Sequence, residues 1–186
     1  MKRVLYLLLL VYVFGCSRQP DTWVTYSDKY DIGSVSLPGE LTEMLDTISF
    51  PTFKLVMVNI TATSNDDNAF GYSLIFPTAL SQFDMFQLKK DSSRLNTIFE
   101  SMINGVEANF KGETVAKNYF NYPEPGVRTA LQIKLTNQIV ICRVIVFDDY
   151  IISTNAVGND EQILTAKEDV FFKTLKVNPE KRNRKF

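Results

Sequence analysis

Alternating apolar and polar residues run through much of the chain and predict a series of β-strands. Residues Val127 to Leu135 alternate strictly, as expected for a strand with one buried face. Residues Ile139 to Phe147 are apolar on both faces, which is typical of a central strand covered on both sides. Further strands are expected over Tyr30–Leu37 (with a β-bulge at Gly33-Ser34), Lys54–Thr63, Ala69–Phe76, Thr114–Tyr122 and Tyr150–Val157. Residues Thr174–Val177 form either a last short strand or an extended end. Short polar turns between successive segments indicate antiparallel pairing.

A single apolar stripe predicts one long helix that begins near Ser92 or Ser93. The stripe recurs at steps of three and four residues, at Leu95, Ile98, Phe99, Met102, Ile103, Val106 and Phe110. We expect Gly112 to end this helix and Gly105 to let it approach the sheet closely. A second helix is expected from Asn159 to about Phe172, and short helical turns at Leu41–Ile48 and around Leu80–Phe86. The fold class is therefore α+β: an α/β/α sandwich with a central, mainly antiparallel sheet of six or seven strands and helices on both faces.

The N-terminus carries a targeting signal. Lys2 and Arg3 precede an apolar run, Val4–Phe14, that is shorter than the ~20 residues a spanning helix needs. The residues that follow, Val13-Phe14-Gly15-Cys16, resemble a bacterial lipobox, and the resemblance implies a diacylglyceryl thioether on Cys16 and cleavage after Gly15. An ordinary signal peptide that happens to precede a cysteine and a short transmembrane anchor are the alternatives.

The domain organisation follows from this signal. We expect a lipoprotein signal peptide at 1–15, the lipidated cysteine and a tether at 16–28, one domain at 29–178 and a basic tail at 179–186. The protein would then lie in the cell envelope, outside the cytoplasm and lipid-anchored to a bacterial membrane, with the outer membrane favoured. The tail, with Lys181, Arg182, Arg184 and Lys185, is either solvated or in contact with anionic headgroups.

Composition excludes several classes of function. Hydrophobic residues make up 45% and charged residues 22%, which excludes global disorder. The net charge of −1 disfavours nucleic-acid binding. The absence of histidine removes His-based acid–base chemistry, catalytic triads that use His, and His-containing zinc sites. The sequence has no phosphate-binding glycine loop and no nucleophile elbow, so we expect no cofactor and no enzyme activity.

The chain also resembles the PsbP-like (Mog-type) superfamily between Tyr30 and Val177. Four features carry the resemblance: an opening strand that ends in Leu37-Pro38-Gly39, a long helix Ser93–Lys111 leading into Thr114-Val115, a Pro125-Gly126 turn before three hairpin strands, and the ending Phe171-Phe172-Lys173-Thr174-Leu175-Lys176. The resemblance implies an α/β/α sandwich and a binding or scaffolding role, because the family has no shared catalytic residues.

Candidate binding residues are few. Arg143 lies in the most apolar strand, on the face of Ile141 and Ile145, where it either pairs with a carboxylate on a covering helix or binds an anion. Tyr119, Tyr122 and Tyr150 belong to a cluster of aromatics that suits an interface, although half of the cluster is expected in the core.

The remaining candidates have structural interpretations. Cys142 is expected to be a buried, inert thiol. The chain has four acidic pairs, and none is a ready-made acid–base dyad because adjacent side chains in a strand or turn splay apart: Asp66-Asp67, Asp148-Asp149, Asp160-Glu161 and Glu168-Asp169. The first two suit turns, and the third suits the start of a helix. The polar loop Ser64–Asn68 could bind Ca²⁺, but its spacing does not match an EF-hand, so no metal site is assigned.

Three functions remain open at this stage. The first is a lipid-anchored envelope protein whose domain is a non-catalytic binding or assembly module with an envelope protein as partner. The second is an envelope carrier of a small apolar or anionic ligand held between sheet and helix. The third is an enzyme that uses carboxylates and tyrosine.

Overall fold

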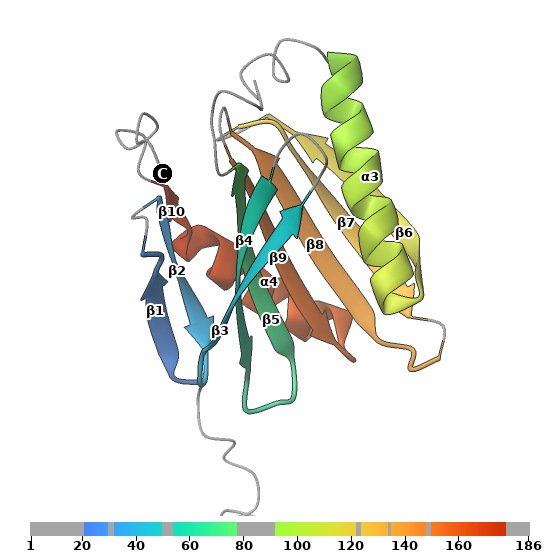
Figure 1. Ribbon diagram of the computed structural model, residues 1–186. Coiled ribbons are helices and arrows are strands. Elements are labelled where there is room, and N and C mark those ends of the chain that lie inside the picture. Colours follow the sequence, from blue (N-terminus) through green and yellow to red (C-terminus); the bar gives the residue numbers. More distant parts are fainter. Residues whose placement is uncertain are drawn as a thin grey trace, which may run out of the picture.

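The structure is a computed structural model of the 186-residue chain. It describes residues 21–29, 32–49, 54–77, 92–121, 124–133, 135–147 and 150–177. Seven strands form the main sheet: β3 (Thr42–Ser49), β4 (Lys54–Thr63), β5 (Ala69–Pro77), β6 (Gly112–Phe120), β7 (Gly126–Ile133), β8 (Ile139–Val146) and β9 (Ile151–Gly158). They pair in the order β3-β4-β5-β9-β8-β7-β6, and each neighbouring pair is antiparallel (Figure 1).

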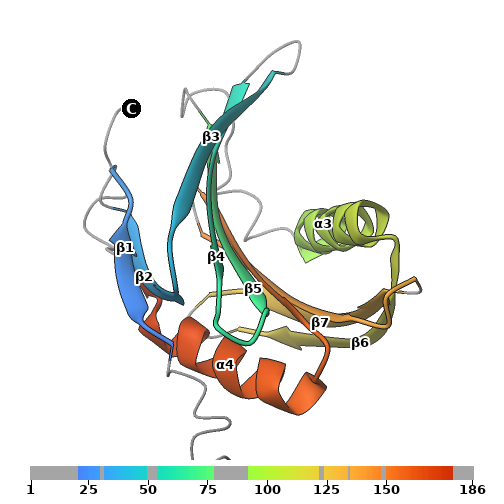
Figure 2. The same cartoon turned by 90° about the horizontal axis from the view of Figure 1, so that it is seen from below.

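A second, smaller sheet and two helices cover the main sheet. The small sheet contains β1 (Trp23–Ser27), β2 (Gly33–Pro38) and β10 (Lys176–Val177), with β2 in the middle. Helix α3 (Ser92–Phe110) lies on one face of the main sheet, whereas α4 (Glu161–Thr174) and the small sheet lie on the other (Figure 2). The described residues therefore form the expected α+β sandwich, with a β-layer on the α4 side that the sequence analysis did not anticipate.

The two faces of the main sheet bury separate apolar cores. On the α4 side, Val35 and Leu37 of β2 and Leu164 and Phe171 of α4 pack onto the inner strands. On the α3 side, Phe99 and Ile103 of the helix pack against the sheet. Strand β8 contributes to both cores, with Ile141 and Ile145 on one side and Val140, Cys142, Val144 and Val146 on the other. The residues that are apolar on both faces thus lie in the middle layer, as their pattern predicts.

The first half of the chain differs most from the sequence-based expectation. Residues Leu41–Ile48 were expected to form a helical turn, but Thr42–Ser49 form strand β3, held by eight consecutive pairs with β4. Trp23–Ser27 fall within the expected tether but form β1, paired with β2. Both segments are extended because they pair with another strand, β3 with β4 and β1 with β2, and not because their own residues alternate between apolar and polar.

Three local details also differ. Strand β2 pairs in unbroken register from Gly33, so it carries no bulge there, and the register shift lies in β6 between Thr114 and Ala116. Helix α3 ends at Phe110, and the next residue, Lys111, adopts the left-handed conformation with a φ of 51° that was expected of Gly112. A Cβ built on Gly105 would meet no atom within 4 Å, so this glycine faces open space and not the sheet. The expected turn around Leu80–Phe86 lies outside the described residues.

Candidate functional site

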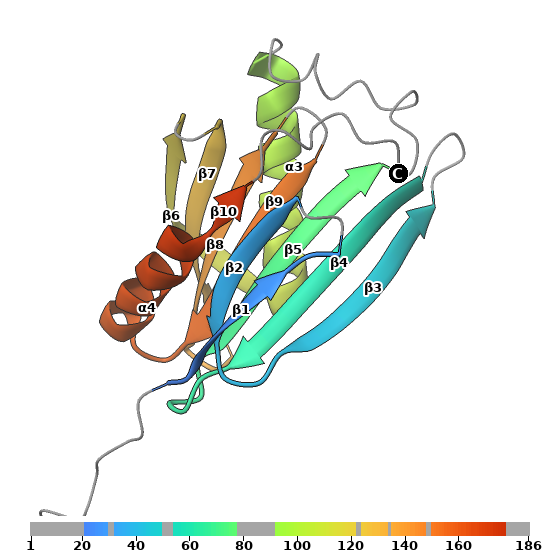
Figure 3. The same ribbon diagram turned by 90° about the vertical axis from the view of Figure 1, so that its left-hand side faces the viewer.

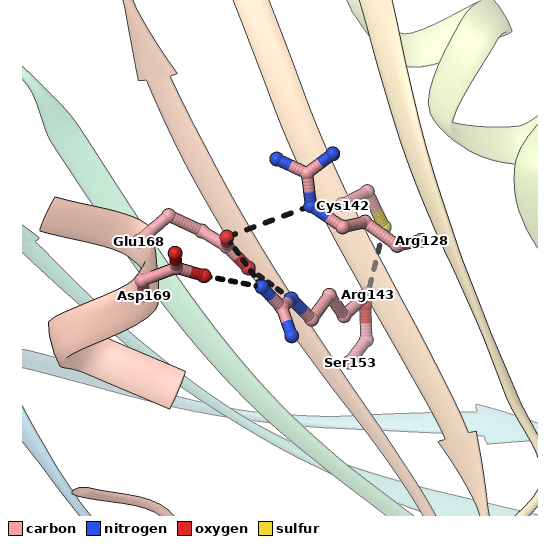
Figure 4. Close-up of polar contacts among 6 residues, drawn as sticks. All are labelled: Arg128, Cys142, Arg143, Ser153, Glu168 and Asp169. Atoms are coloured by element: carbon pink, nitrogen blue, oxygen red, sulfur yellow. Dashed lines mark hydrogen bonds and ion pairs between the residues drawn. The ribbon is translucent and has the colours of Figure 1, made fainter. Parts of the chain in front are cut away.

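Arg143 lies in a buried ionic network between β8 and α4. Its guanidinium donates to Glu168 through Nε and through Nη2, the latter at 2.8 Å from Oε2, and Nη2 also contacts Asp169 Oδ1 at 2.8 Å (Figure 4). The Phe172 ring centroid lies 4.1 Å from the Arg143 Cζ. The side chain of Glu168 is 1% exposed, and that of Arg143 is 14% exposed. Arg143 therefore forms an ion pair with a covering helix, which is the structural alternative considered for it.

A second arginine shares the same buried carboxylate. Arg128 of β7 is the register partner of Arg143, and its Nε lies 3.6 Å from Glu168 Oε2. In Figure 4 the terminal guanidinium nitrogens of Arg128 point away from Glu168. Glu168 and Asp169 thus balance the charges of two arginines, and the arrangement joins α4 to β7 and β8. The sequence points to Arg143 and to the acidic pair, but no pattern in it connects Arg128 to them.

Tyr119 lies on the opposite face, beside α3. Its side chain is on β6 and 54% exposed, and its hydroxyl donates to Glu100 Oε1 at 2.7 Å. Lys117 Nζ donates to both oxygens of Glu100 at 2.9 Å. Hydrogen bonds from Lys117 and Tyr119 lower the pKa of Glu100, and the bond to Glu100 raises the pKa of Tyr119. This exposed trio ties the β6 edge to α3.

Tyr150, another of the candidate tyrosines, does not lie beside Tyr119. Tyr150 is 2% exposed and stacks on Phe147 with ring centroids 4.5 Å apart, so it lies in the core and not at a surface where a partner could bind. Tyr122 lies outside the described residues, as do Cys16 and the tail at 179–186.

Cys142 is buried on the α3 side of β8. Its Sγ lies 3.8 Å from Ser153 Oγ, and burial raises the pKa of the thiol to about 11. A thiol with so high a pKa is protonated at neutral pH and is a poor nucleophile.

The acidic pairs have structural roles where the structure describes them. Asp160 caps α4, with its Oδ1 accepting from the Gln162 N–H at 2.9 Å. Asp66 accepts a hydrogen bond from the Ser64 hydroxyl and forms an ion pair with Lys167, whose Nζ lies 2.7 Å from Asp66 Oδ2. Asp67 adopts a φ of 62° in the same turn. No group of potential metal ligands occurs in the described part of the chain, and Asp148-Asp149 lie outside it.

Lys167 connects three parts of the chain that are remote in sequence. Its Nζ lies 2.6 Å from Asp21 Oδ2 and 2.7 Å from Asp66 Oδ2, and Asp21 Oδ1 accepts from the Asn65 N–H at 2.8 Å. Burial alone would raise the pKa of Asp66, but hydrogen bonds from Lys167 and Ser64 outweigh burial and lower it. We call Lys167, Asp21 and Asp66 the Lys167 clamp. It ties Asp21 to the turn at Asp66 and to α4, and the sequence offered no signal for it because its members are up to 146 positions apart.

A further buried carboxylate, Asp28, serves the small sheet. It accepts from the backbone N–H groups of Ile32 at 3.2 Å and Gly33 at 2.5 Å, and so closes the turn between β1 and β2. Tyr72 of β5 lies against this turn, since a Cβ on Gly33 would stand 2.9 Å from its hydroxyl. Burial, reinforced by the negative charge of Asp28, raises the pKa of Tyr72. Both groups are structural and lie beyond the reach of solvent.

The β3 edge of the main sheet differs from this enclosed interior. Met44 is 60% exposed and Leu45 is 51% exposed, on the last strand of the sheet (Figure 3). A cavity of about 350 Å³ adjoins the beginning of β3 and is lined by Glu40, Thr42, Thr61, Ala62 and Thr63. This surface was not predicted from the sequence, because residues 41–48 were expected to form a helical turn and not a strand.

Neither described helix is long and apolar enough to cross a membrane. No protein-family model matches the sequence, and no curated protein matches it. A solved structure is similar: the solution structure of CyanoP, the cyanobacterial PsbP of Synechocystis sp. PCC 6803, with a TM-score of 0.52. The similarity covers 88% of this chain and 96% of that chain at 10% sequence identity. At this identity the similarity concerns the fold, and the chain therefore has a PsbP-like fold.

Proposed function

We propose that this chain is a lipid-anchored envelope protein whose PsbP-like domain is a non-catalytic binding or assembly module. The observation that carries the proposal is the contrast between an interior whose charged groups are paired and an exposed edge of the main sheet. In the described residues, the charged groups Arg143, Glu168 and Lys167 are paired with one another or with nearby carboxylates, and Cys142 is protonated. The side chains of Met44 and Leu45, by contrast, stand exposed on an edge strand, where an apolar contact is available to a partner.

The short distance from the lipobox to the folded domain supports the anchor. The Lys167 clamp holds Asp21, and five residue steps separate Cys16 from Asp21. Five extended residues span at most about 18 Å. A lipidated Cys16 would therefore keep the domain close to the bilayer, and each buried CH₂ of its acyl chains would add about 0.8 kcal/mol to membrane binding.

The carrier function has less support. Between the sheet and the two helices, Phe99, Ile103 and Phe171 are buried among the apolar core residues. The cavity beside β3 is lined by threonine hydroxyls and the Glu40 carboxylate, which suit neither an apolar nor an anionic ligand.

Replacement of Cys16 tests the anchor. In cells that carry Cys16→Ser, we expect the domain to be released from the membrane or to remain as an uncleaved precursor, as measured by membrane fractionation and intact mass. Cys142→Ser is the matched control and should keep membrane retention and mature mass. Unchanged processing and retention of the Cys16→Ser chain would refute the anchor. Affinity purification of the wild-type protein from its membranes, followed by mass spectrometry, tests the assembly role, and recovery of a stoichiometric small molecule without a protein would favour the carrier.

A further inference from the structure

The two edge strands of the main sheet are protected to very different degrees. Strand β6 carries a register shift between Thr114 and Ala116 and an exposed Lys117, two features that discourage a further strand from pairing with an edge. Helix α3 also packs beside β6, and Glu100 of α3 holds Lys117 and Tyr119. The β6 edge is therefore blunted.

Strand β3 has none of these protections. It pairs with β4 through eight consecutive residues without a register shift, and it contains no proline, lysine or arginine. Residues 42–47 are all exposed, and among the described residues no strand pairs with the outer side of β3. The Thr47 N–H donates to the Asp46 carboxylate of its own strand at 2.7 Å, a bond that an incoming strand could replace. Such an edge is a template for an additional strand.

The side chains of β3 specify the chemistry of that strand. Glu43 and Asp46 are acidic, and they flank the exposed apolar pair Met44 and Leu45. The described part of β4 opposite them, Leu55–Thr63, carries no charge that could neutralise the two carboxylates. Cross-strand partners of opposite charge stabilise a sheet, so positions facing Glu43 and Asp46 call for lysine or arginine.

The neighbouring cavity selects for the same charge. It lies at the beginning of β3, where Glu40 supplies a carboxylate and Thr42, Thr61 and Thr63 supply hydroxyl groups. An ammonium group has only donors, and each of these side chains offers an acceptor. A lysine one or two residues beyond the paired segment would place its charge there.

We propose that the β3 edge binds an extended basic segment of another protein by adding it to the main sheet as a further strand. The inference deepens the binding role proposed above and rests on it. The segment has the pattern basic-apolar-apolar-basic, with the apolar pair against Met44 and Leu45, the basic pair against Glu43 and Asp46, and a further lysine directed to the Glu40 cavity.

A second copy of this chain fits the edge less well than a different protein. If two β3 strands paired antiparallel about Met44 and Leu45, Glu43 of one copy would face Asp46 of the other. Like charges directly opposite each other destabilise a sheet. The acidic edge therefore favours a basic segment of a different protein.

The test uses the full chain in a nonionic detergent and a fluorescent peptide, Thr-Lys-Val-Val-Lys-Thr-Lys. Its core reads the same in both directions, so it can pair with β3 in either orientation. We expect the peptide to bind about tenfold more tightly than a scrambled peptide of the same composition, Lys-Lys-Lys-Thr-Thr-Val-Val, by fluorescence anisotropy. Hydrogen exchange should show new protection at alternate amides within residues 43–47, those whose N–H groups do not already bond to β4.

Paired charge reversals locate the site. Glu43→Lys with Asp46→Lys should weaken peptide binding by about tenfold or more, while Glu113→Lys with Glu161→Lys, which makes the same charge change on β6 and α4, should alter it by less than about threefold. Any of four outcomes would overturn the inference: equal weakening by both pairs of substitutions, equal binding of the scrambled peptide, absence of peptide binding, or new protection from hydrogen exchange outside β3. Sedimentation that reveals a dimer abolished by Glu43→Lys with Asp46→Lys would replace the proposed partner with a second copy.

The test is separate from that of the anchor. Binding at β3 in detergent does not depend on the lipid, so an unmodified Cys16 would remove the anchor and leave this result intact. A lipidated chain that ignores the peptide would remove only this inference.

Discussion

The buried Glu168 offers the sharpest test of how α4 is held to the sheet. Its carboxylate is 1% exposed and lies between the guanidinium groups of Arg143 and Arg128. Replacement by leucine keeps a similar volume but leaves two cations without their shared anion. Removal of one partner from a buried ion pair costs about 3–5 kcal/mol of unfolding free energy.

The expected cost lies at the lower end of this range. Arg143 would keep its contact with Asp169, whose side chain is 49% exposed, and its position over the Phe172 ring. Arg128 is 23% exposed and could turn toward water. We therefore expect Glu168→Leu to lower the free energy of unfolding by about 3 kcal/mol. Arg143→Met should cost about 2 kcal/mol, because Arg128 would still pair with Glu168.

The double variant separates an ion pair from simple loss of packing. With Arg143→Met and Glu168→Leu combined, the buried charges of the pair are gone and two apolar side chains face each other. We expect the double variant to lose only about 2 kcal/mol, so the interaction energy of the cycle is about 3 kcal/mol. Urea unfolding reports these values through Trp23, the sole tryptophan, which packs 6.4 Å from the Phe70 ring centroid.

The exposed Val170 on the same helix supplies the control. Val170→Ala should change the free energy of unfolding by less than about 0.5 kcal/mol. If the losses of the two single variants simply add in the double variant, to about 5 kcal/mol, then Arg143 and Glu168 do not act as a pair and the account of the network is wrong.

Three further predictions concern other parts of the domain. Lys167→Met should lower the unfolding free energy by about 2 kcal/mol at pH 7. Because the pKa of Asp66 is depressed in the folded state, the stability difference between wild type and variant should be full above the ordinary pKa of a carboxylate and should fade as the pH falls through the folded-state pKa. A stability difference that stays constant down to pH 2 would contradict this prediction. Gly39→Ala should destabilise the folded protein by about 2 kcal/mol or more, because Gly39 has a φ of 84° and an added Cβ would clash with the Thr63 carbonyl. Gly105→Ala, on the exposed side of α3, should instead stabilise the protein by about 1 kcal/mol. Equal effects of the two substitutions in thermal unfolding would refute this contrast. Cys142 should resist a thiol-specific reagent at pH 8 until urea unfolds the chain. Rapid labelling of Cys142 itself in the folded protein, located by peptide mass spectrometry, would disprove its burial and its pKa of about 11.

Regular patterns in the sequence were sufficient to predict the inner elements. The stripe from Leu95 to Phe110 predicted α3 to within a residue or two, and the doubly apolar run from Ile139 predicted β8. These segments succeed because burial dictates their composition: a residue that faces the core must be apolar whatever its partner is. The order of such segments predicted the sandwich class, and the resemblance of particular sequence features to the PsbP-like superfamily predicted the PsbP-like fold.

Features at the margin of the sheet escaped the same reasoning. Residues 42–47 of β3 are exposed on both faces, so burial imposes no period on their sequence, and only the pairing with β4 defines the strand. Strand β1 and the two-residue β10 likewise exist because β2 lies between them. A backbone hydrogen bond carries no information about side chains, which is why these strands could not be predicted from the sequence pattern.

The chain by itself thus determined which segments are buried, that Arg143 needed an anionic partner, and that a lipobox-like motif precedes the domain. Only the tertiary structure decided that this partner is Glu168 on α4, that Lys167 joins Asp21 to Asp66, and that β3 is left as the open edge. The reason is that hydrophobic burial depends on a residue's own side chain, whereas an ion pair or a sheet edge depends on which distant segments the fold brings together.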